Sequence, residues 1–264
     1  MDLRNKVIMI SGASSGIGKS LAQLLSTKSA KVVLLARRGE RLMEIEAELK
    51  AAKHEVLVVK TDITDRDQVS NAVRLTLEAF GRIDVVINNA GVGYFGTIEK
   101  LPIEEFDRLV KTNVYGMLHL SQSAIPALKK SQGMIVNISS GLRKRALPFL
   151  SAYSSTKSMI DALSDGMRLE LRRYGVKVLN YCPPETDTEI FEMTKNEAGL
   201  DANQAGHRKK AKVEDVASRI VEAIVADKRE VVDGGRFLQI MNLFAPKLLD
   251  NMFYKGMVQK ILKD

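Results

Sequence analysis

Short runs of apolar, mostly β-branched residues alternate along the chain with longer amphipathic stretches. Seven of these runs have the length and composition of strands: Lys6–Ile10, Lys31–Leu35, Glu55–Lys60, Val85–Asn88, Met134–Ser139, Lys177–Tyr181 and Glu230–Val232. Apolar positions at helical spacing predict helices over Gly16–Lys28, Arg41–Lys53, Asp67–Phe80, Ala152–Tyr174 and Val213–Ala226, with two more beginning near Ile103 and Val114.

The predicted strands are apolar on both faces, as in Val7–Ile10 and Val32–Leu35. Strands of this kind belong to parallel sheets that helices cover on both sides. Repeated strand–helix–strand units therefore predict an α/β fold of the Rossmann type, with a doubly wound, mainly parallel seven-stranded sheet and helices on both faces. In such a fold the ligand lies at the carboxyl ends of the strands.

Two segments depart from this alternation. Residues 189–212 are polar and too long for a simple connection, which favours a substrate lid. Residues 236–264 have apolar positions at helical spacing on both sides of Pro246, so we expect a C-terminal extension of two helices. This extension could serve a subunit interface, the substrate pocket or a membrane surface. No linker interrupts the chain, and we expect one domain over residues 1–264.

Composition narrows the classes of function. The single cysteine, Cys182, favours a reducing compartment, and the absence of a signal-like or membrane-spanning segment predicts a cytoplasmic protein. The net charge of +8 could suit nucleic acid, an anionic membrane surface or anionic small molecules. No nucleic-acid motif accompanies it, so we expect no nucleic acid and a solvated basic surface that suits a phosphorylated cofactor. His54, His119 and His207 form no cluster, and we expect no metal site.

A glycine-rich segment, Ser11–Gly18, follows the first predicted strand and opens the first helix. Gly12, Gly16 and Gly18 would allow a tight turn and close approach of the backbone to a pyrophosphate, with Ser14, Ser15 and Ile17 between them. The helix N-terminus adds unpaired N–H groups. The strand–turn–helix context predicts a dinucleotide site, with a purely structural turn as the alternative.

Two arginines, Arg37 and Arg38, follow the second predicted strand. An NAD enzyme usually has an acidic residue here, about twenty residues beyond the glycines, bonded to the ribose 2′-OH. Ala36 stands at that place instead, and guanidinium groups suit a 2′-phosphate. We therefore predict NADP(H) as cofactor, with solvated loop charges as the alternative.

Tyr153 and Lys157 lie four residues apart on a predicted helix and share one face. A nearby ammonium would lower the pKa of a phenol toward that of a usable base. The pair is common by itself, but here it accompanies the glycine turn, Asn88–Gly91, Asn113–Gly116 and Ser139–Ser140, in that order along the chain. Over residues 6 to 232 the sequence resembles the short-chain dehydrogenase/reductase family.

The resemblance implies four catalytic residues. Ser140, thirteen residues before Tyr153, would bond the substrate oxygen, and Tyr153 would exchange a proton with it. Lys157 would lower the tyrosine pKa and bind the nicotinamide ribose, and Asn113 would hold a water in a proton relay. Two alternatives stay open: Ser139 as the active serine, and Asn113 as a hydrogen-bonding residue of the helix alone.

The resemblance also implies contacts to the cofactor outside the glycine turn and the arginines. Asp62 would bond the adenine, with a helix cap as its alternative role. The other residues in this set are Ile63, Asn89, Ala90, Gly91, Tyr153, Lys157, Pro183, Thr186 and Thr188. Pro184 stands where many family members have glycine, which puts the local geometry of this turn in doubt.

For the substrate, the family implies a small molecule that is a ketone or aldehyde, with or without a long chain, or the corresponding alcohol. Pro183–Thr188 resembles the 3-ketodihydrosphingosine reductase branch, which makes a long-chain ketone the specific alternative. Family members commonly form homodimers or homotetramers, and we expect the same here. A non-catalytic NADP(H)-binding regulatory or scaffold protein is the alternative of another class.

Overall fold

The computed structural model describes residues 1–190 and 210–259, and its centre is a seven-stranded parallel sheet. The strand order is β3-β2-β1-β4-β5-β6-β7, so the chain reverses direction across the sheet between β1 and β4. The strands are β1 Val7–Ser11, β2 Lys31–Ala36, β3 Val56–Lys60, β4 Val85–Asn88, β5 Met134–Ile138, β6 Lys177–Cys182 and β7 Glu230–Val232. The expected doubly wound sheet is confirmed, and every strand pair in it is parallel.

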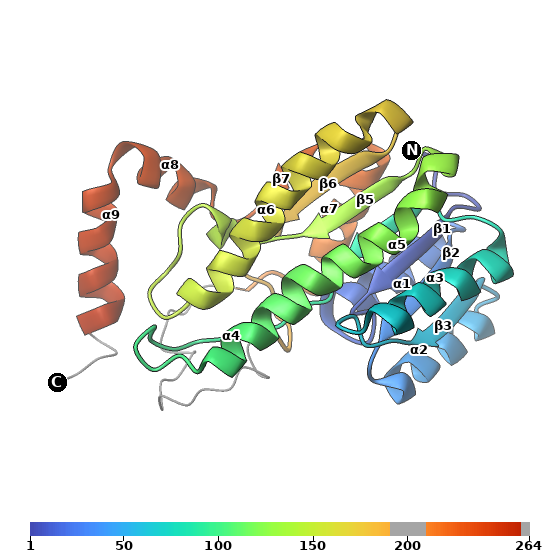
Figure 1. Cartoon of the computed structure of the whole chain (residues 1–264), viewed down its shortest axis with the longest axis horizontal. Helices are drawn as coiled ribbons and strands as arrows, with labels where there is room; N and C mark the ends of the chain where they lie inside the picture. The colour runs from blue at the N-terminus through green and yellow to red at the C-terminus, as the bar shows by residue number, and fades with distance from the viewer. Residues whose placement is uncertain (191–209, 260–264) are drawn as a thin grey trace.

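Helices cover both faces of the sheet (Figure 1). One face carries α1 Gly16–Thr27, α2 Gly39–Ala51 and α7 Val213–Val225. The other carries α3 Arg66–Phe80, α5 Gly116–Ser131 and α6 Ser151–Leu171. Strand residues alternate between the two layers: Ile8 and Ile10 pack toward α1, and Val7 and Met9 pack toward α5. This double burial explains why the strands read as uninterrupted apolar runs.

The two helices predicted to begin near Ile103 and Val114 form one continuous rod. α4, Ile103–Val110, passes through a π-helical turn at Lys111–Tyr115 directly into α5. A π turn holds one more residue than an α turn, and such turns often occur at functional sites. This one contains Asn113, whose side chain it buries.

The other predicted helices differ from the observed ones by a few residues at their ends. α2 begins and ends two residues earlier than expected. The last three residues of the predicted Ala152–Tyr174 helix form a 3-10 turn after α6.

The C-terminal segment contains α8, Arg236–Phe244, and α9, Pro246–Phe253, which meet at Ala245, beside Pro246. Both helices lie at one end of the molecule, away from α1–α3 (Figure 1). Leu238, Leu249 and Phe253 are buried. Six other large apolar residues of α8 and α9 are exposed in the chain by itself: Phe237, Ile240, Leu243, Phe244, Leu248 and Met252.

Most of the predicted lid lies outside the described residues, since the structure describes only 189, 190 and 210–212 of its span. Residues 260–264 of the predicted extension lie outside them as well. Within the described ranges, no helix combines the length and the apolar composition that crossing a bilayer requires.

Candidate functional site

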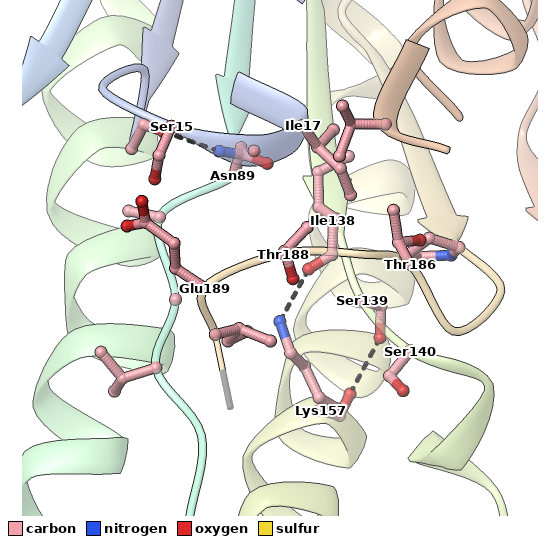
Figure 2. A pocket seen from close by; sticks show the side chains of 18 of the residues that line it. Ser15, Ile17, Asn89, Ile138, Ser139, Ser140, Lys157, Thr186, Thr188 and Glu189 are labelled. Carbon is pink, nitrogen blue, oxygen red and sulfur yellow. Dashed lines mark hydrogen bonds between the residues drawn. The ribbon is translucent and has the colours of Figure 1, made fainter. Parts of the chain in front are cut away.

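A cavity of about 950 Å³ lies at the carboxyl ends of the strands, where the fold predicts a ligand. Figure 2 shows the cavity from close by, with Ser15 and Asn89 at one side and Ser140 and Lys157 at another. Eighteen of the predicted site residues line the cavity: Gly12, Ser14, Ser15, Gly16, Ile17, Arg37, Arg38, Asp62, Ile63, Asn89, Ala90, Gly91, Ser140, Tyr153, Lys157, Pro183, Thr186 and Thr188. Gly18 and Asn113 do not line it.

The glycine turn is held against the loop that follows β4. The Asn89 amide donates to the carbonyl oxygens of Ser11 at 3.0 Å and Gly12 at 3.2 Å. Gly12 has a φ of +66°, and a Cβ atom there would lie 2.9 Å from Ala90 Cα. A Cβ atom on Gly18 would lie 2.3 Å from the Gly12 carbonyl oxygen, so Gly18 shapes the turn from behind.

The two arginines after β2 have different surroundings. Arg37 is exposed and lines the cavity. The Arg38 guanidinium donates to the hydroxyls of Ser14 at 3.1 Å and Ser15 at 2.8 Å, which fixes it on the glycine turn. It also forms an ion pair with Glu189, N···O 2.7 Å, so it is more than a solvated loop charge.

Asp62 follows β3 and lines the same end of the cavity. One of its carboxylate oxygens accepts from the N–H of Thr64 at 2.9 Å and from its hydroxyl at 2.8 Å. The cap of α3 is Asp65, which accepts from the N–H groups of Asp67 and Gln68. The helix-cap alternative for Asp62 is therefore wrong.

The two serines after β5 have separate surroundings. Ser139 is buried, and its hydroxyl donates to the Lys157 carbonyl oxygen at 3.3 Å, a contact drawn in Figure 2. Ser140 is half-buried, accepts from the Leu142 N–H at 3.2 Å, and has a side-chain hydrogen bond with Tyr153. The geometry favours Ser140 over Ser139 as the serine that meets a substrate.

Tyr153 and Lys157 lie on one face of α6, and both are buried except for their contact with the cavity. The Lys157 ammonium donates to the Ile138 carbonyl oxygen at 2.9 Å and lies 5.7 Å from the centre of the Tyr153 ring (Figure 2 shows the first contact). Phenol, ammonium and the Ser140 hydroxyl thus meet at one place, as the spacing along the chain indicated.

Burial shifts the pKa of both groups. Loss of water raises the pKa of Tyr153 to about 12, and the hydrogen bond with Ser140 opposes this rise. Loss of water also lowers the pKa of Lys157 to about 8. The expectation that Lys157 lowers the tyrosine pKa during the reaction stays a prediction, since the rise in the chain by itself comes mainly from burial. At neutral pH Tyr153 is therefore a phenol that can donate a proton.

Asn113 links the elements behind the cavity. Its amide oxygen accepts from the Val92 N–H at 2.8 Å, and its amide nitrogen donates to the Val92 carbonyl at 3.0 Å and to the Thr156 hydroxyl at 3.0 Å. A Cβ atom on Gly91 would lie 3.4 Å from the Asn113 oxygen and 3.8 Å from the Lys157 nitrogen. The partners lie outside its own helix, so Asn113 does more than bond within that helix.

The segment after β6 forms a second wall of the cavity. Pro183 and Pro184 pack against Gly234, where a Cβ atom would lie 2.5 Å from the Pro183 carbonyl oxygen. Pro184 therefore fits the turn, and no peptide bond in the described chain is cis. A Cβ atom built on Gly16 would lie 3.2 Å from Thr188 Cγ2, so Thr188 lies against the start of α1.

The end of the cavity beyond Tyr153 is apolar, and sequence reasoning did not identify most of the residues that line it. Five apolar side chains lie there: Phe95, Leu142, Leu147, Leu150 and Leu238. They come from the loop after β4, the loop after β5 and α8, segments whose proximity no local pattern indicates. The helical spacing of the C-terminal segment predicted apolar helices without singling out Leu238.

A buried ionic cluster beside the Ser140 loop was also missed. Arg143 is 5% exposed, and its guanidinium pairs with Asp161 at 2.6 Å and with Glu230 at 2.5 Å. Asp161 also accepts from Asn180 at 2.7 Å and pairs with Lys144 at 2.6 Å. Arg143 thus joins the Ser140 loop to α6 and β7.

Known proteins resemble the chain over most of its length. A family model described as short chain dehydrogenase matches residues 6–199. An uncharacterized oxidoreductase of Staphylococcus aureus (strain USA300) is 33% identical over 227 residues, which is 86% of this chain and 94% of the relative. These comparisons do not show the finer likeness to the 3-ketodihydrosphingosine reductase branch.

Two solved structures share the fold and carry bound nucleotides. An alcohol dehydrogenase of the archaeon Thermococcus sibiricus, complexed with 5-hydroxy-NADP, has a TM-score of 0.77 and 27% identity over 88% of this chain and 97% of that chain. A 3-ketoacyl-(acyl-carrier-protein) reductase of Brucella melitensis, complexed with NADH, has a TM-score of 0.78 and 27% identity over 89% of this chain and 98% of that chain. The chain therefore belongs to the short chain dehydrogenase family of oxidoreductases.

Proposed function

We propose that this oxidoreductase uses NADP(H) to reduce a ketone or aldehyde to an alcohol, or to run the reverse oxidation. The observation that carries the proposal is one cavity with two ends. The glycine turn, Arg37 and Arg38 line one end, and Ser140, Tyr153 and Lys157 line the other. The relatives' bound nucleotides include both NADP and NAD forms, so the preference for NADP(H) rests on this chain's arginines.

The glycine turn fits a pyrophosphate, because the first N–H groups of a helix have no partner within it and the side chain of the N-cap residue, Ser15, does not cap the start of α1. A cavity of about 950 Å³ is at the upper end of the range for ligand sites, which suits a dinucleotide together with a substrate. When bound, the nicotinamide would supply the hydride that is added to the carbonyl carbon in reduction, or accept the hydride that leaves the alcohol in oxidation.

The chain's own groups supply the proton and stabilise the charge. In reduction, the Tyr153 phenol donates its proton to the carbonyl oxygen of the substrate as the hydride is added to the carbonyl carbon. Ser140 donates a hydrogen bond to the same oxygen as negative charge develops on it. Lys157 holds a positive charge beside the ring, and Asn113 acts as a positioning residue that holds the loop after β4 and α6 together.

The apolar end of the cavity favours a substrate with an apolar substituent next to its carbonyl group. Phe95, Leu147 and Leu238 would exclude water from such a group. A long-chain ketone of the sphingoid type is a second candidate on this ground, beside other apolar carbonyl compounds.

A substrate panel with purified protein tests the function. We expect NADPH to be oxidised with one or more of 3-ketodihydrosphinganine, an acetoacetyl thioester, a steroid ketone and medium-chain alkanones, and kcat/KM to be higher than for small ketones. The measurement is the absorbance of NADPH at steady state. Tight binding of NADPH without turnover of any carbonyl would instead favour a non-catalytic NADP(H)-binding protein.

The arginines after β2 predict the choice of coenzyme. We expect the protein to bind NADPH more tightly than NADH, and Arg38→Ala to weaken NADPH binding by roughly ten- to a hundred-fold, since charge-assisted hydrogen bonds to the 2′-phosphate are lost. Arg37→Ala, which removes an exposed side chain, is expected to have a smaller effect. NADH binding by either variant is expected to stay within about two-fold of the parent. Equal affinity of the parent for both coenzymes would contradict the assignment.

A further inference from the structure

Three charged side chains form a network at the coenzyme end of the cavity. Glu189 pairs through one carboxylate oxygen with Arg38 at 2.7 Å, and through the other with Arg41 at 2.7 Å. Arg41 lies on the first turn of α2, two residues beyond its start at Gly39. The three residues are about one-third to one-half exposed, so water and small ligands can reach them.

The network lies where a 2′-phosphate would bind. Arg38 is fixed on the glycine turn by its bonds to Ser14 and Ser15, just beyond the end of β2. The ribose 2′ position of a bound dinucleotide lies beside this strand end. Glu189 gives each guanidinium one anionic oxygen, which is also how a phosphate bridges two arginines. Figure 2 shows its side chain extending toward Ser15.

The backbone carries Glu189 to this place. The N–H of Asp187 donates to the Ala211 carbonyl at 3.0 Å, and the N–H of Ala211 donates to the Glu185 carbonyl at 2.8 Å. Thr188 lies against Gly16 at the start of α1. These contacts hold the residues just before Glu189 beside α1. The carboxylate that pairs with the two arginines therefore belongs to a segment whose backbone is fixed.

We propose that Glu189 is an internal competitor of the coenzyme 2′-phosphate, and that Arg41 together with Arg38 binds this phosphate once the carboxylate is displaced. The inference rests on the proposed use of NADP(H). It adds two residues to coenzyme selection, one that favours the phosphate and one that opposes it. NADH carries no 2′-phosphate and leaves the network undisturbed.

The charge of Glu189 is permanent under ordinary conditions. Hydrogen bonds from Arg38 and Arg41 lower the pKa of this carboxyl group to about 2. Protonation near neutral pH therefore does not free the arginines, and a phosphate must compete with an ionised carboxylate. The Glu189 carboxylate and a 2′-phosphate on the same two arginines would repel each other, so the two anions compete for the pair.

Replacing the carboxylate by a neutral amide separates this proposal from a structural role. We expect Glu189→Gln to bind NADPH roughly three- to twenty-fold more tightly than the parent, given the modest strength of exposed ion pairs. NADH affinity is expected to change by less than about two-fold. Both dissociation constants are measured by titrating coenzyme fluorescence without any carbonyl substrate. Adenosine 2′,5′-bisphosphate serves as a competing ligand that carries the 2′-phosphate without the nicotinamide half.

Two further variants control the experiment. Glu44→Gln removes an exposed negative charge from the same helix as Arg41, and it is expected to leave both affinities unchanged if the effect of Glu189 is local. Arg41→Met in the Glu189→Gln background is expected to remove most of the gain for NADPH and none of the NADH affinity. Thermal unfolding of each variant verifies that it is folded.

The outcomes separate this inference from the proposed function. Unchanged or weaker NADPH binding by Glu189→Gln, or equal gains for both coenzymes, would overturn the competition. An Arg41→Met change that affects NADPH and NADH alike would overturn the role of Arg41. Turnover does not enter these titrations, so absent carbonyl reduction would count against the proposed function and leave this result standing.

Discussion

The Tyr153→Phe variant is expected to bind NADPH as tightly as the parent and to reduce carbonyl compounds about 10²–10⁴-fold more slowly. The ring of Tyr153 is buried, so phenylalanine preserves its packing and removes the hydroxyl alone. Burial raises the pKa of Tyr153 to about 12, which keeps the proton on the phenol at neutral pH and makes it available to a carbonyl oxygen. Steady-state NADPH oxidation and fluorescence titration of NADPH give the two quantities.

Tyr115→Phe is the matched control for this variant. Tyr115 is 49% exposed, does not line the cavity and lies in the π turn beside Asn113. Removing its hydroxyl is expected to leave turnover within about two-fold of the parent. If Tyr153→Phe kept more than about a tenth of the parental rate, the assignment of Tyr153 as the proton donor would be wrong. A parallel loss of NADPH binding would indicate a structural role instead.

The Arg143→Met variant is expected to lower the free energy of unfolding by about 3–5 kcal/mol, because it leaves the carboxylate of Asp161 buried without its main partner. For a chain of this size, that corresponds to a decrease in Tm of roughly 10 °C. Turnover is expected to fall as well, since Arg143 ends the short helix that Ser140 caps. Thermal and urea unfolding measure the first effect.

Lys144→Met and a double variant test the cause of this loss. The Lys144 side chain is 52% exposed and pairs with the same carboxylate, so its loss is expected to cost less than about 1 kcal/mol. Replacing both buried partners, as in Arg143→Met with Asp161→Leu, is expected to regain much of the stability, because the charges left without these partners, on Glu230 and Lys144, are exposed to water. An Arg143→Met protein that unfolds at the parental temperature would show that the pair does not stabilise the fold.

The doubly wound sheet could be predicted from local pattern because its central strands are buried on both faces. Runs such as Val7–Ile10 and Val32–Leu35 admit no amphipathic strand, and the stretches between them have the spacing of helices. The π turn was not predicted. Its residues continue the helical pattern of their neighbours, so the local sequence does not mark the wider turn.

Much of the site could be predicted because motif residues follow strands whose carboxyl ends share one edge of the sheet. Gly12 follows β1, Asn89 follows β4 and Ser140 follows β5, which brings them to one cavity. The choice of Ser140 over Ser139 is supported by the Ser139 hydroxyl, which is bonded to the Lys157 carbonyl. The roles of these residues in the reaction stay predictions until variants are assayed.

The contacts that could not be predicted join segments far apart in the chain. Arg38 and Glu189 are 151 residues apart, and no spacing rule connects an acid after β6 to an arginine after β2. The rise in the pKa of Tyr153 on burial could not be predicted for a related reason. Burial of a side chain depends on every element packed around it, whereas the i to i+4 spacing shows only the neighbouring ammonium.

Transfer of deuterium tests the central claim most directly. The substrate panel is assayed with NADPH that carries deuterium at C4 of the nicotinamide. NADPH labelled on each of the two faces is tested, which establishes the face that the enzyme uses. The alcohol product is then examined by mass spectrometry. The account predicts one deuterium on the carbinol carbon with the parent protein, and almost none over the same time with Tyr153→Phe. Coenzyme oxidation that leaves the carbonyl compound unchanged and unlabelled would contradict it.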